Sequence, residues 1–262
     1  MIGAIIGDYI GSAYEFGRNK DWDVKLVTPH SSITDDTIMS LAVADAIMQG
    51  KPYAERMRYW GQKYPNPVGG YGGSFARWLM SSEPQPYNSF GNGAAMRVAA
   101  IGWAYGTLEE VLLEAHRSAM CTHDHPEGIK GAQATAAAVY LTRMGMGKED
   151  LTAYIEQAFG YDLHRSWEQL HATYEYNESC QQTVPEALIC YLQSHSFEQA
   201  MRMGVSLGGD ADTLLCITGA VAQARAKYDA NYEPASKLAK KALATLPVEL
   251  KEIYNRFTAK YC

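Results

Sequence analysis

Two acidic stretches, far apart in the chain, carry the residue types best suited to chemistry. The first is TDDT at residues 34–37, just before an apolar run, and the second is DADT at residues 210–213, just after two glycines. Asp and Thr at a helix start accept hydrogen bonds from the free N–H groups of the first turn, and the helix dipole favours anions there. Helix capping is therefore one explanation for each stretch.

A shared metal site is the second explanation. Four carboxylates from two helix starts meet in space only if something neutralises them. Mg²⁺ and Mn²⁺ do so, because they take oxygen ligands from carboxylates, hydroxyls and water. Thr34 and Thr213 add neutral oxygens, and the glycines before Asp210 let the backbone approach a ligand closely. Periodicity alone does not bring the two stretches together, so both explanations stay open here.

Two further acids belong to an apolar N-terminal segment, residues 1–16. Asp8 falls inside its helical pattern and Glu15 near its end. An acid at such a position is either paired or functional, because burying an unpaired carboxylate is costly. For Asp8 we expect a hydrogen bond from one helix to another. The residues alone assign no role to Glu15.

The segments that must position these residues have helical patterns. Apolar residues recur at helical spacing over residues 37–49, and a glycine follows. Thr107 and Glu110 have the spacing of a capping box, and so do Ser196 and Gln199.

Small residues recur on several of the expected helices, with Gly3, Gly7 and Gly11 at a spacing of four. Such faces let two helix backbones approach closely. Pro185 is expected in the first turn of a helix, where proline is tolerated. No run alternates in the manner of a strand, and no hairpin signal appears. With 262 residues, the chain is predicted to form a single compact all-α domain over residues 1–262.

Composition narrows the function classes. The chain is 47% hydrophobic and 20% charged, which is ordinary for a packed protein, and its net charge of −6 argues against a broad nucleic-acid surface. No stretch has the roughly 18 apolar residues of a membrane span. The five cysteines include no C-x-x-C pair, and the apolar N-terminus lacks the basic residues of a secretory signal. We therefore expect reduced thiols, a cytoplasmic location and no membrane partner.

Five motifs then occur in an order that resembles the ADP-ribosylglycohydrolase family. They are GDYIGSAYEF, TDDTIM, GNGAAMR, THDHP and LGGDADT with a following ITGA, and they extend from Ile2 to about Ala224. That family includes the enzyme that reactivates dinitrogenase reductase and the ADP-ribosylarginine and ADP-ribosylserine hydrolases. Each motif alone is weak, but five in order are specific.

The resemblance implies an orthogonal helical domain with two metal ions, Mg²⁺ or Mn²⁺, at the base of a cleft. Glu15 matches a glutamate that approaches the metals in family members and acts in catalysis in some of them. With Asp36 and Asp212 it forms the predicted catalytic set. The implied metal ligands are Thr34, Asp35, Asp36, Asp210, Asp212 and Thr213.

The resemblance also implies an ADP-ribose-bearing substrate, either a modified protein or a small molecule. Glycine-rich turns at residues 69–74 and 88–97 are suited to a diphosphate, because backbone N–H groups bind phosphate without basic side chains. Phe90 or Tyr71 is expected to stack on adenine, and Arg97 to be a buried structural partner. The predicted substrate-binding residues are Gly73, Ser89, Phe90, Gly91, Asn92 and His123.

The expected reaction is metal-dependent hydrolysis of the glycosidic bond between ADP-ribose and an acceptor. Ser89 stands where some arginine-specific members carry an acid, so this loop resembles the serine- and poly-ADP-ribose-directed branch. Two other functions stay open. One is a di-metal phosphoesterase acting on ADP-ribose-like substrates, and the other is a non-catalytic ADP-ribose-binding or structural protein.

Overall fold

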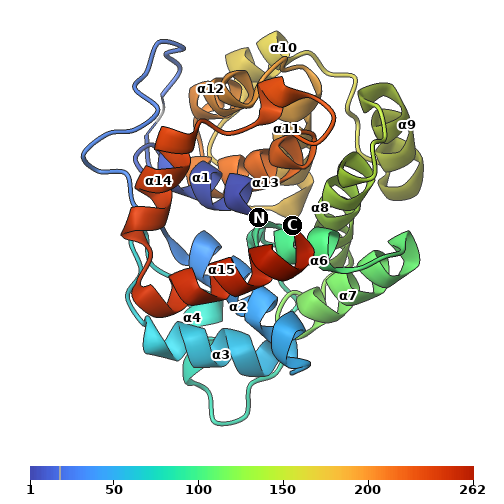
Figure 1. Cartoon of the computed structure of the whole chain (residues 1–262). Coiled ribbons are helices and arrows are strands. Elements are labelled where there is room, and N and C mark those ends of the chain that lie inside the picture. Colours follow the sequence, from blue (N-terminus) through green and yellow to red (C-terminus); the bar gives the residue numbers. More distant parts are fainter. Residues whose placement is uncertain (18) are drawn as a thin grey trace.

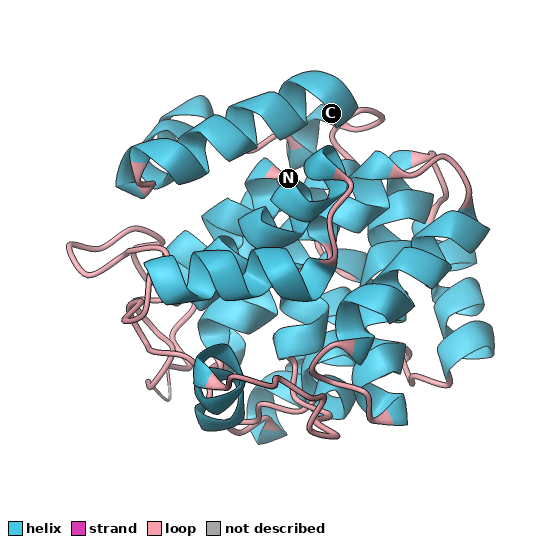
Figure 2. Ribbon diagram, turned by 90° about the horizontal axis from the view of Figure 1, so that it is seen from below, coloured by secondary structure: helices cyan, strands magenta, loops and turns pink. Residues whose placement is uncertain are grey.

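The computed structural model describes residues 1–17 and 19–262, and Figure 2 shows that helices joined by loops make up this part of the chain. Within it, β-pairing is confined to two isolated bridges, Thr34 with Val68 and Gly91 with Ser179. The predicted all-α class is therefore confirmed. The assignment of residues 1–262 to a single domain stays a prediction.

The helices surround one hydrophobic core, with α1 and α13 near its centre (Figure 1). In chain order they are α1 Ile2–Gly11, α2 Asp35–Gln49, α3 Tyr53–Lys63, α4 Gly73–Met80, α5 Gly93–Met96, α6 Ala99–Ala104, α7 Leu108–Met120, α8 Pro126–Arg143, α9 Lys148–Phe159, α10 Trp167–Thr173, α11 Cys180–Leu192, α12 Phe197–Leu207, α13 Ala211–Ala224, the 3₁₀ turn η1 Ala230–Tyr232, α14 Ser236–Thr245 and α15 Val248–Tyr261.

Helices α1 and α13 pack backbone against backbone. Every fourth residue of α1 from Gly3 to Gly11 faces α13, and a Cβ atom at Gly7 would lie 1.9 Å from the carbonyl oxygen of Leu215. The spacing of these glycines thus has the predicted consequence, a close helix approach. It also brings Asp8 of α1 near Asp212, which lies in the first turn of α13.

We expect the substitution Gly7→Ala to destabilise the protein strongly. The added methyl group meets the backbone of α13 at 1.9 Å, so a helix rather than a side chain must move. Overpacking of this kind costs about 3 kcal/mol, which lowers the melting temperature by roughly 6–12 °C. Thermal unfolding followed by circular dichroism measures the change. Gly72→Ala is the matched control, because that position has an ordinary φ of −52° and open space around it. Equal melting temperatures for the two variants would contradict the packing argument.

Helix α2 holds the first acidic stretch at its start. Thr34 is its N-cap, and the Thr34 hydroxyl accepts a hydrogen bond from the backbone N–H of Asp36 at 3.2 Å. The helix ends at Gly50, which has the left-handed φ of +63° that favours glycine. The predicted helix is confirmed, and the capping explanation for this stretch is correct as far as it goes.

The capping predictions for two other helices had different outcomes. Thr107 and Glu110 form the predicted capping box at the start of α7. Ser196 caps α12 by accepting from the N–H of Gln199, but the Gln199 side chain accepts from His195 instead of closing the box on Ser196. The second half of that prediction is wrong, because the side-chain oxygen of Gln199 accepts from the backbone N–H of His195, one residue before Ser196.

Pro185 does not lie in a first helical turn. Helix α11 begins at Cys180, so the proline is inside it. The earlier start is stabilised by the neighbouring loop, because the N–H of Cys180 donates to the carbonyl of Phe90 at 2.9 Å. The prediction for Pro185 was wrong because the helix start depends on this pairing between distant segments, which no local sequence pattern reveals.

Candidate active site

A cleft of about 330 Å³ opens where the C-terminal end of α1 meets the N-terminal ends of α2 and α13. The glycine-rich residues 69–74 also line it. Most of the site residues predicted from the sequence come together here. Those that line the cleft are Glu15, Asp35, Asp36, Gly73, Ser89, Gly91, Asn92, His123, Asp210, Asp212 and Thr213.

Thr34 and Phe90 are not part of the lining. Thr34 is fully buried next to the acids, and its hydroxyl donates to Asp8 Oδ1 at 2.8 Å. The side chain of Phe90 is 48% exposed and meets the ring of His125 edge-on, with centroids 5.3 Å apart. Of the two aromatic residues expected to stack on adenine, only Tyr71 lines the cleft.

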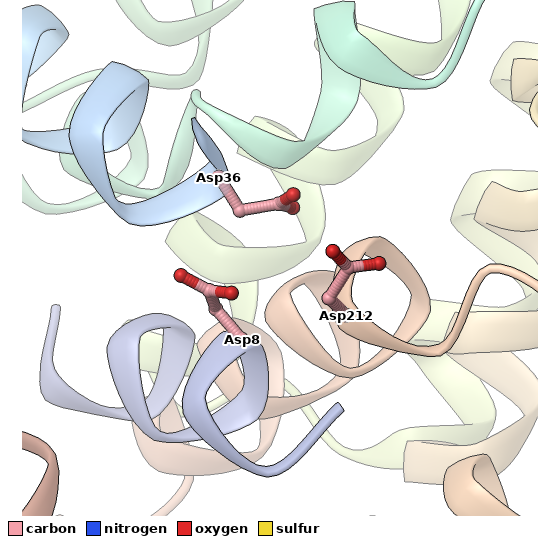
Figure 3. Close-up of side chains that lie close together, drawn as sticks. All are labelled: Asp8, Asp36 and Asp212. Carbon is pink, nitrogen blue, oxygen red and sulfur yellow. The ribbon is translucent and has the colours of Figure 1, made fainter. Parts of the chain in front are cut away.

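The two acidic stretches meet at the base of the cleft. Carboxylate oxygens of Asp8, Asp36 and Asp212 all lie within 4.8 Å of one another, and Figure 3 shows the three side chains pointing into a common space. A second group with the same spacing joins Glu15, Asp210 and Asp212. Asp212 belongs to both groups. Helix capping alone does not explain such a convergence, and each group has the spacing that could hold a metal ion.

Asp8 anchors the first acidic stretch to α1. Its Oδ2 atom accepts from the N–H groups of Thr34 and Thr37, at 3.0 and 3.1 Å, and from the Thr37 hydroxyl. The expected hydrogen bond from helix to helix is confirmed. The sequence analysis did not place Asp8 in the acidic group with Asp36 and Asp212. An acid inside an apolar helix was the signal that could have indicated it.

The carboxylates of this site disfavour one another's ionisation. Burial raises the pKa of Asp36 well above its usual range, and the charges of Asp212 and Asp8 raise it further. The Oδ1 atom of Asp36 is buried and has no hydrogen-bond partner. Thr213 donates to the other oxygen at 3.2 Å. An orphaned carboxylate oxygen among acids and hydroxyls is a donor set that fits a hard divalent cation.

Among residues 1–17 and 19–262, none of the ion pairs involves a carboxylate of the cleft. Closely spaced carboxylates without a cation disfavour one another's ionisation. The arrangement is therefore able to bind metal, which agrees with the metal prediction at the level of the cluster.

Glu15 stands in the turn after α1, partly buried beside Gly69. A Cβ atom at Gly69 would lie 2.8 Å from Glu15 Oε2, and Gly69 also has a positive φ of +80°, so glycine is required on both counts. Burial raises the pKa of Glu15 to about 8, and the negative charge of Asp212 adds to the shift. Without cations the side chain is mostly protonated at neutral pH, as a proton donor requires.

Asn92 uses its side chain to hold an acid. The amide donates to Asp210 Oδ2 at 2.7 Å and to the hydroxyl of Thr183 at 3.1 Å. The backbone N–H of Asn92 donates to the carbonyl of Glu178 at 2.7 Å. This residue was predicted for substrate binding, and in the structure its side chain positions Asp210.

His123 and Tyr87 line another part of the cleft. His123 is 6% exposed, and its ring lies 5.6 Å from the ring of Tyr87. Burial, helped by the nearby charge of Arg97, lowers the pKa of His123 well below its usual range, so the imidazole is neutral. Arg97 is fully buried and donates to the backbone of Ser118 at 2.8 Å, which confirms the expected structural role.

Sequence reasoning missed several residues of the lining, among them Tyr87, Tyr176 and Glu178. Tyr176 donates to Glu178 at 2.6 Å. Both belong to the segment before α11, which reaches the cleft only because it pairs with the loop that contains Gly91. No motif or periodicity in the sequence indicates that Tyr176 and Glu178 line the cleft.

Comparison with known proteins decides the family. A family model described as ADP-ribosylglycohydrolase matches residues 1–251. The chain belongs to the ADP-ribosylglycohydrolase family. It is 26% identical to the ADP-ribosylhydrolase ARH3 of Mus musculus, over 86% of this chain and 82% of that protein. It is 25% identical to the ADP-ribosylarginine hydrolase Tri1 of Pseudomonas putida, over 86% of this chain and 68% of that protein.

The solved structures agree. A chain of a structure titled ADP-ribosylglycohydrolase-related protein complex superposes with a TM-score of 0.71 at 25% identity, covering 99% of this chain and 96% of that one. For this ADP-ribosylglycohydrolase, membership of the family confirms the predicted enzyme class, a hydrolase of glycosyl bonds. Over the part of the chain that is described, no helix combines the length and the apolar character that crossing a membrane requires.

Proposed function

We propose that this protein hydrolyses the glycosidic bond between ADP-ribose and an acceptor, and that two divalent cations, Mg²⁺ or Mn²⁺, serve the reaction. The convergence of two carboxylate groups on Asp212, at the base of a cleft, is the observation that carries the proposal. The family and the names of the relatives support ADP-ribose as the group that is released.

The proposed ligands are the acids and hydroxyls at the two helix starts. Asp36 offers its unpartnered Oδ1, and Asp212 belongs to both carboxylate groups. Asp8 is left out, because its oxygens already accept hydrogen bonds from Thr34 and Thr37. Bound cations would orient the hydroxyls of the distal ribose and lower the pKa of a water molecule. The proposed set is Thr34, Asp35, Asp36, Asp210, Asp212 and Thr213.

Glu15 is the proposed general acid–base. Glycosidic cleavage passes through an oxocarbenium-like transition state, in which the leaving atom gains a proton and water attacks the anomeric carbon. The Glu15 carboxyl lies beside Asp212 and lines the cleft, where it can exchange a proton with the leaving atom or with the attacking water. Its contact with the Gly69 backbone keeps it at the acidic end of the cleft.

The rest of ADP-ribose is proposed to extend along the glycine-rich turns and His123, which also line the cleft. Gly73 begins helix α4, and backbone N–H groups at a helix start favour phosphate oxygens. Ser89, Gly91 and His123 also line the cleft, and Tyr71 offers an aromatic ring. The diphosphate of this substrate would thereby avoid the carboxylates that surround the distal ribose.

The linkage is tested with three substrates: peptides ADP-ribosylated on serine, peptides ADP-ribosylated on arginine, and poly-ADP-ribose. The protein is incubated with each in Mg²⁺, and the products are weighed by mass spectrometry. Intact ADP-ribose from one or more of them supports the proposal and names the linkage. Ser89, in place of an acid, favours serine or poly-ADP-ribose. Release of AMP instead would show phosphoester cleavage, and binding without release would show a binding protein.

Cation binding should stabilise the protein more at high pH than at low pH. The pKa values of Asp8 and Asp210 are raised to about 6, and that of Glu15 to about 8, so the cation-free fold binds more protons than the unfolded chain between about pH 4 and pH 8. Its stability therefore falls as pH rises through this window. Cations replace these protons, so their effect grows with pH.

In numbers, Mg²⁺ at about 100 times its dissociation constant should raise the melting temperature by roughly 5–10 °C at pH 8, and by less at pH 6. Differential scanning fluorimetry at both pH values measures the shift. The variant Asp212→Asn should lose it. A shift of the same size in that variant would place the bound cation elsewhere.

A further inference from the structure

Arg97 is a buried cation without a counter-ion. Its side chain is 0% exposed, and in the described part of the chain no carboxylate lies within ion-pair distance of it. Its Nη2 atom donates to the carbonyl of Ser118 at 2.8 Å, while its Nε atom has no partner. The end of α7 offers only the partial negative charge of a helix C-terminus. An unpaired buried charge is expensive, so its position next to the cleft calls for an explanation.

A chain of hydrogen bonds leads from Arg97 into the cleft. Its Nη2 atom also donates to Thr122 Oγ1 at 2.7 Å, and that oxygen lies 2.8 Å from His123 Nδ1. A guanidinium group only donates hydrogen bonds, so the Thr122 oxygen accepts from it. The Thr122 hydroxyl proton is then free to go to the imidazole. When it does, His123 Nδ1 is the acceptor and the ring proton of the neutral imidazole is on Nε2.

The Nε2 atom of His123 faces the loop that lines the cleft. It lies 3.3 and 3.5 Å from the points that Cβ atoms at Gly93 and Gly91 would occupy. The absence of side chains at these glycines leaves its N–H accessible from the cleft. A neutral imidazole with its proton on Nε2 presents a hydrogen-bond donor at this wall, and a buried positive charge stands behind it.

We propose that Arg97 is a positioning residue which, through Thr122, fixes His123 as an Nε2–H donor for an anionic oxygen of the substrate's diphosphate. This inference rests on the proposed function. It gives Arg97 a task beyond structural support: its charge favours the anion from within the wall, and its hydrogen bond sets the tautomer. An acidic protein thereby gains a site for an anionic group that a buried cation supports from behind the cleft wall.

The test uses Thr122→Val, which removes the hydroxyl and leaves the Arg97 charge in place. Thr135→Val is the matched control, because Thr135 is also buried and its hydroxyl has no partner. The tautomer of His123 is determined in the ligand-free protein by ¹⁵N NMR of the imidazole, with His123→Gln to assign the signal. Dissociation constants for ADP-ribose and for adenosine, which lacks the diphosphate, are measured by calorimetry.

We expect a pure Nε2–H tautomer in the wild-type protein and in Thr135→Val, and a mixture of tautomers in Thr122→Val. The dissociation constant for ADP-ribose should rise about tenfold in Thr122→Val, while that for adenosine changes less than about twofold. An Nδ1–H tautomer in the wild-type protein would overturn the inference, and so would equal losses for both ligands. Failure of the wild-type protein to bind ADP-ribose would refute the proposed function and the anionic ligand of His123, while the tautomer would still report on the hydrogen-bond chain.

Arg97→Lys and Arg97→Met give a second measurement if they fold, which melting curves establish. Lysine keeps the charge but not the reach and shape of the guanidinium group. We expect both variants to lose the pure Nε2–H tautomer of His123. ADP-ribose should bind more weakly to Arg97→Met than to Arg97→Lys. Wild-type affinity in Arg97→Met would show that the charge has no part in binding.

Discussion

The variant Asp212→Asn should lose cation binding and lower kcat/KM for an ADP-ribosylated substrate by at least about a thousandfold, which is roughly 4 kcal/mol of transition-state stabilisation. Asp212 is the one carboxylate shared by both acidic groups at the base of the cleft. Asparagine keeps its size but removes the charge that a hard cation needs. Calorimetric titration with Mg²⁺ and steady-state kinetics measure the two losses.

The control for this variant is Asp150→Asn, which removes an exposed carboxylate from the first turn of α9, far from the cleft lining. It should retain cation affinity and activity. Asp36→Asn should resemble Asp212→Asn, because it removes the carboxylate with the unpartnered buried oxygen. Full activity and full Mg²⁺ affinity in both cleft variants would refute the assignment of these acids.

The variant Glu15→Gln should lower kcat by about 10²–10⁴ and leave the dissociation constants of Mg²⁺ and ADP-ribose within a few-fold of the wild type. Glutamine retains the shape beside Gly69 but neither gives up nor takes a proton. The ground-state complex therefore forms, and the chemical step fails. Single-turnover kinetics separate this step from binding and product release.

Glu15 also lies within reach of Asp210 and Asp212, so a role as a cation ligand is the competing assignment. Loss of Mg²⁺ affinity in Glu15→Gln, in parallel with the loss of activity, would favour that role over proton transfer. Glu83→Gln, on an exposed loop, is the control and should behave as the wild type.

The parts of the site that helix starts provide were predictable from the sequence. TDDT and DADT each predict a helix that begins with acidic residues. The regularly spaced glycines of α1 predict that another helix packs closely against it. Asp8 shows how these signals combine. The hydrogen bonds from Thr34 and Thr37 follow from an acid placed in an apolar helix, and its nearness to Asp212 follows from the glycine contact.

The parts that depend on pairing between distant loops were not predictable. Glu178 reaches the cleft through its carbonyl's hydrogen bond with the N–H of Asn92, a contact that neither segment signals alone. The same pairing starts α11 early and leaves Pro185 inside the helix. Phe90, in the glycine-rich stretch 88–97, was expected to stack on adenine, yet its half-exposed ring packs against His125. Motif position fixed the backbone there but not the direction of the side chain.

The acidic residues at the base of the cleft are proposed to cleave a glycosidic bond with the help of bound cations. The most direct test follows one ADP-ribosylated peptide, of the linkage found to be hydrolysed, by mass spectrometry. Protein stripped with EDTA is added first, and excess Mg²⁺ later. We predict an unchanged peptide until Mg²⁺ is added, and then intact ADP-ribose together with the unmodified peptide. Equal turnover by the stripped protein, or AMP with a peptide that still carries ribose phosphate, would contradict the account.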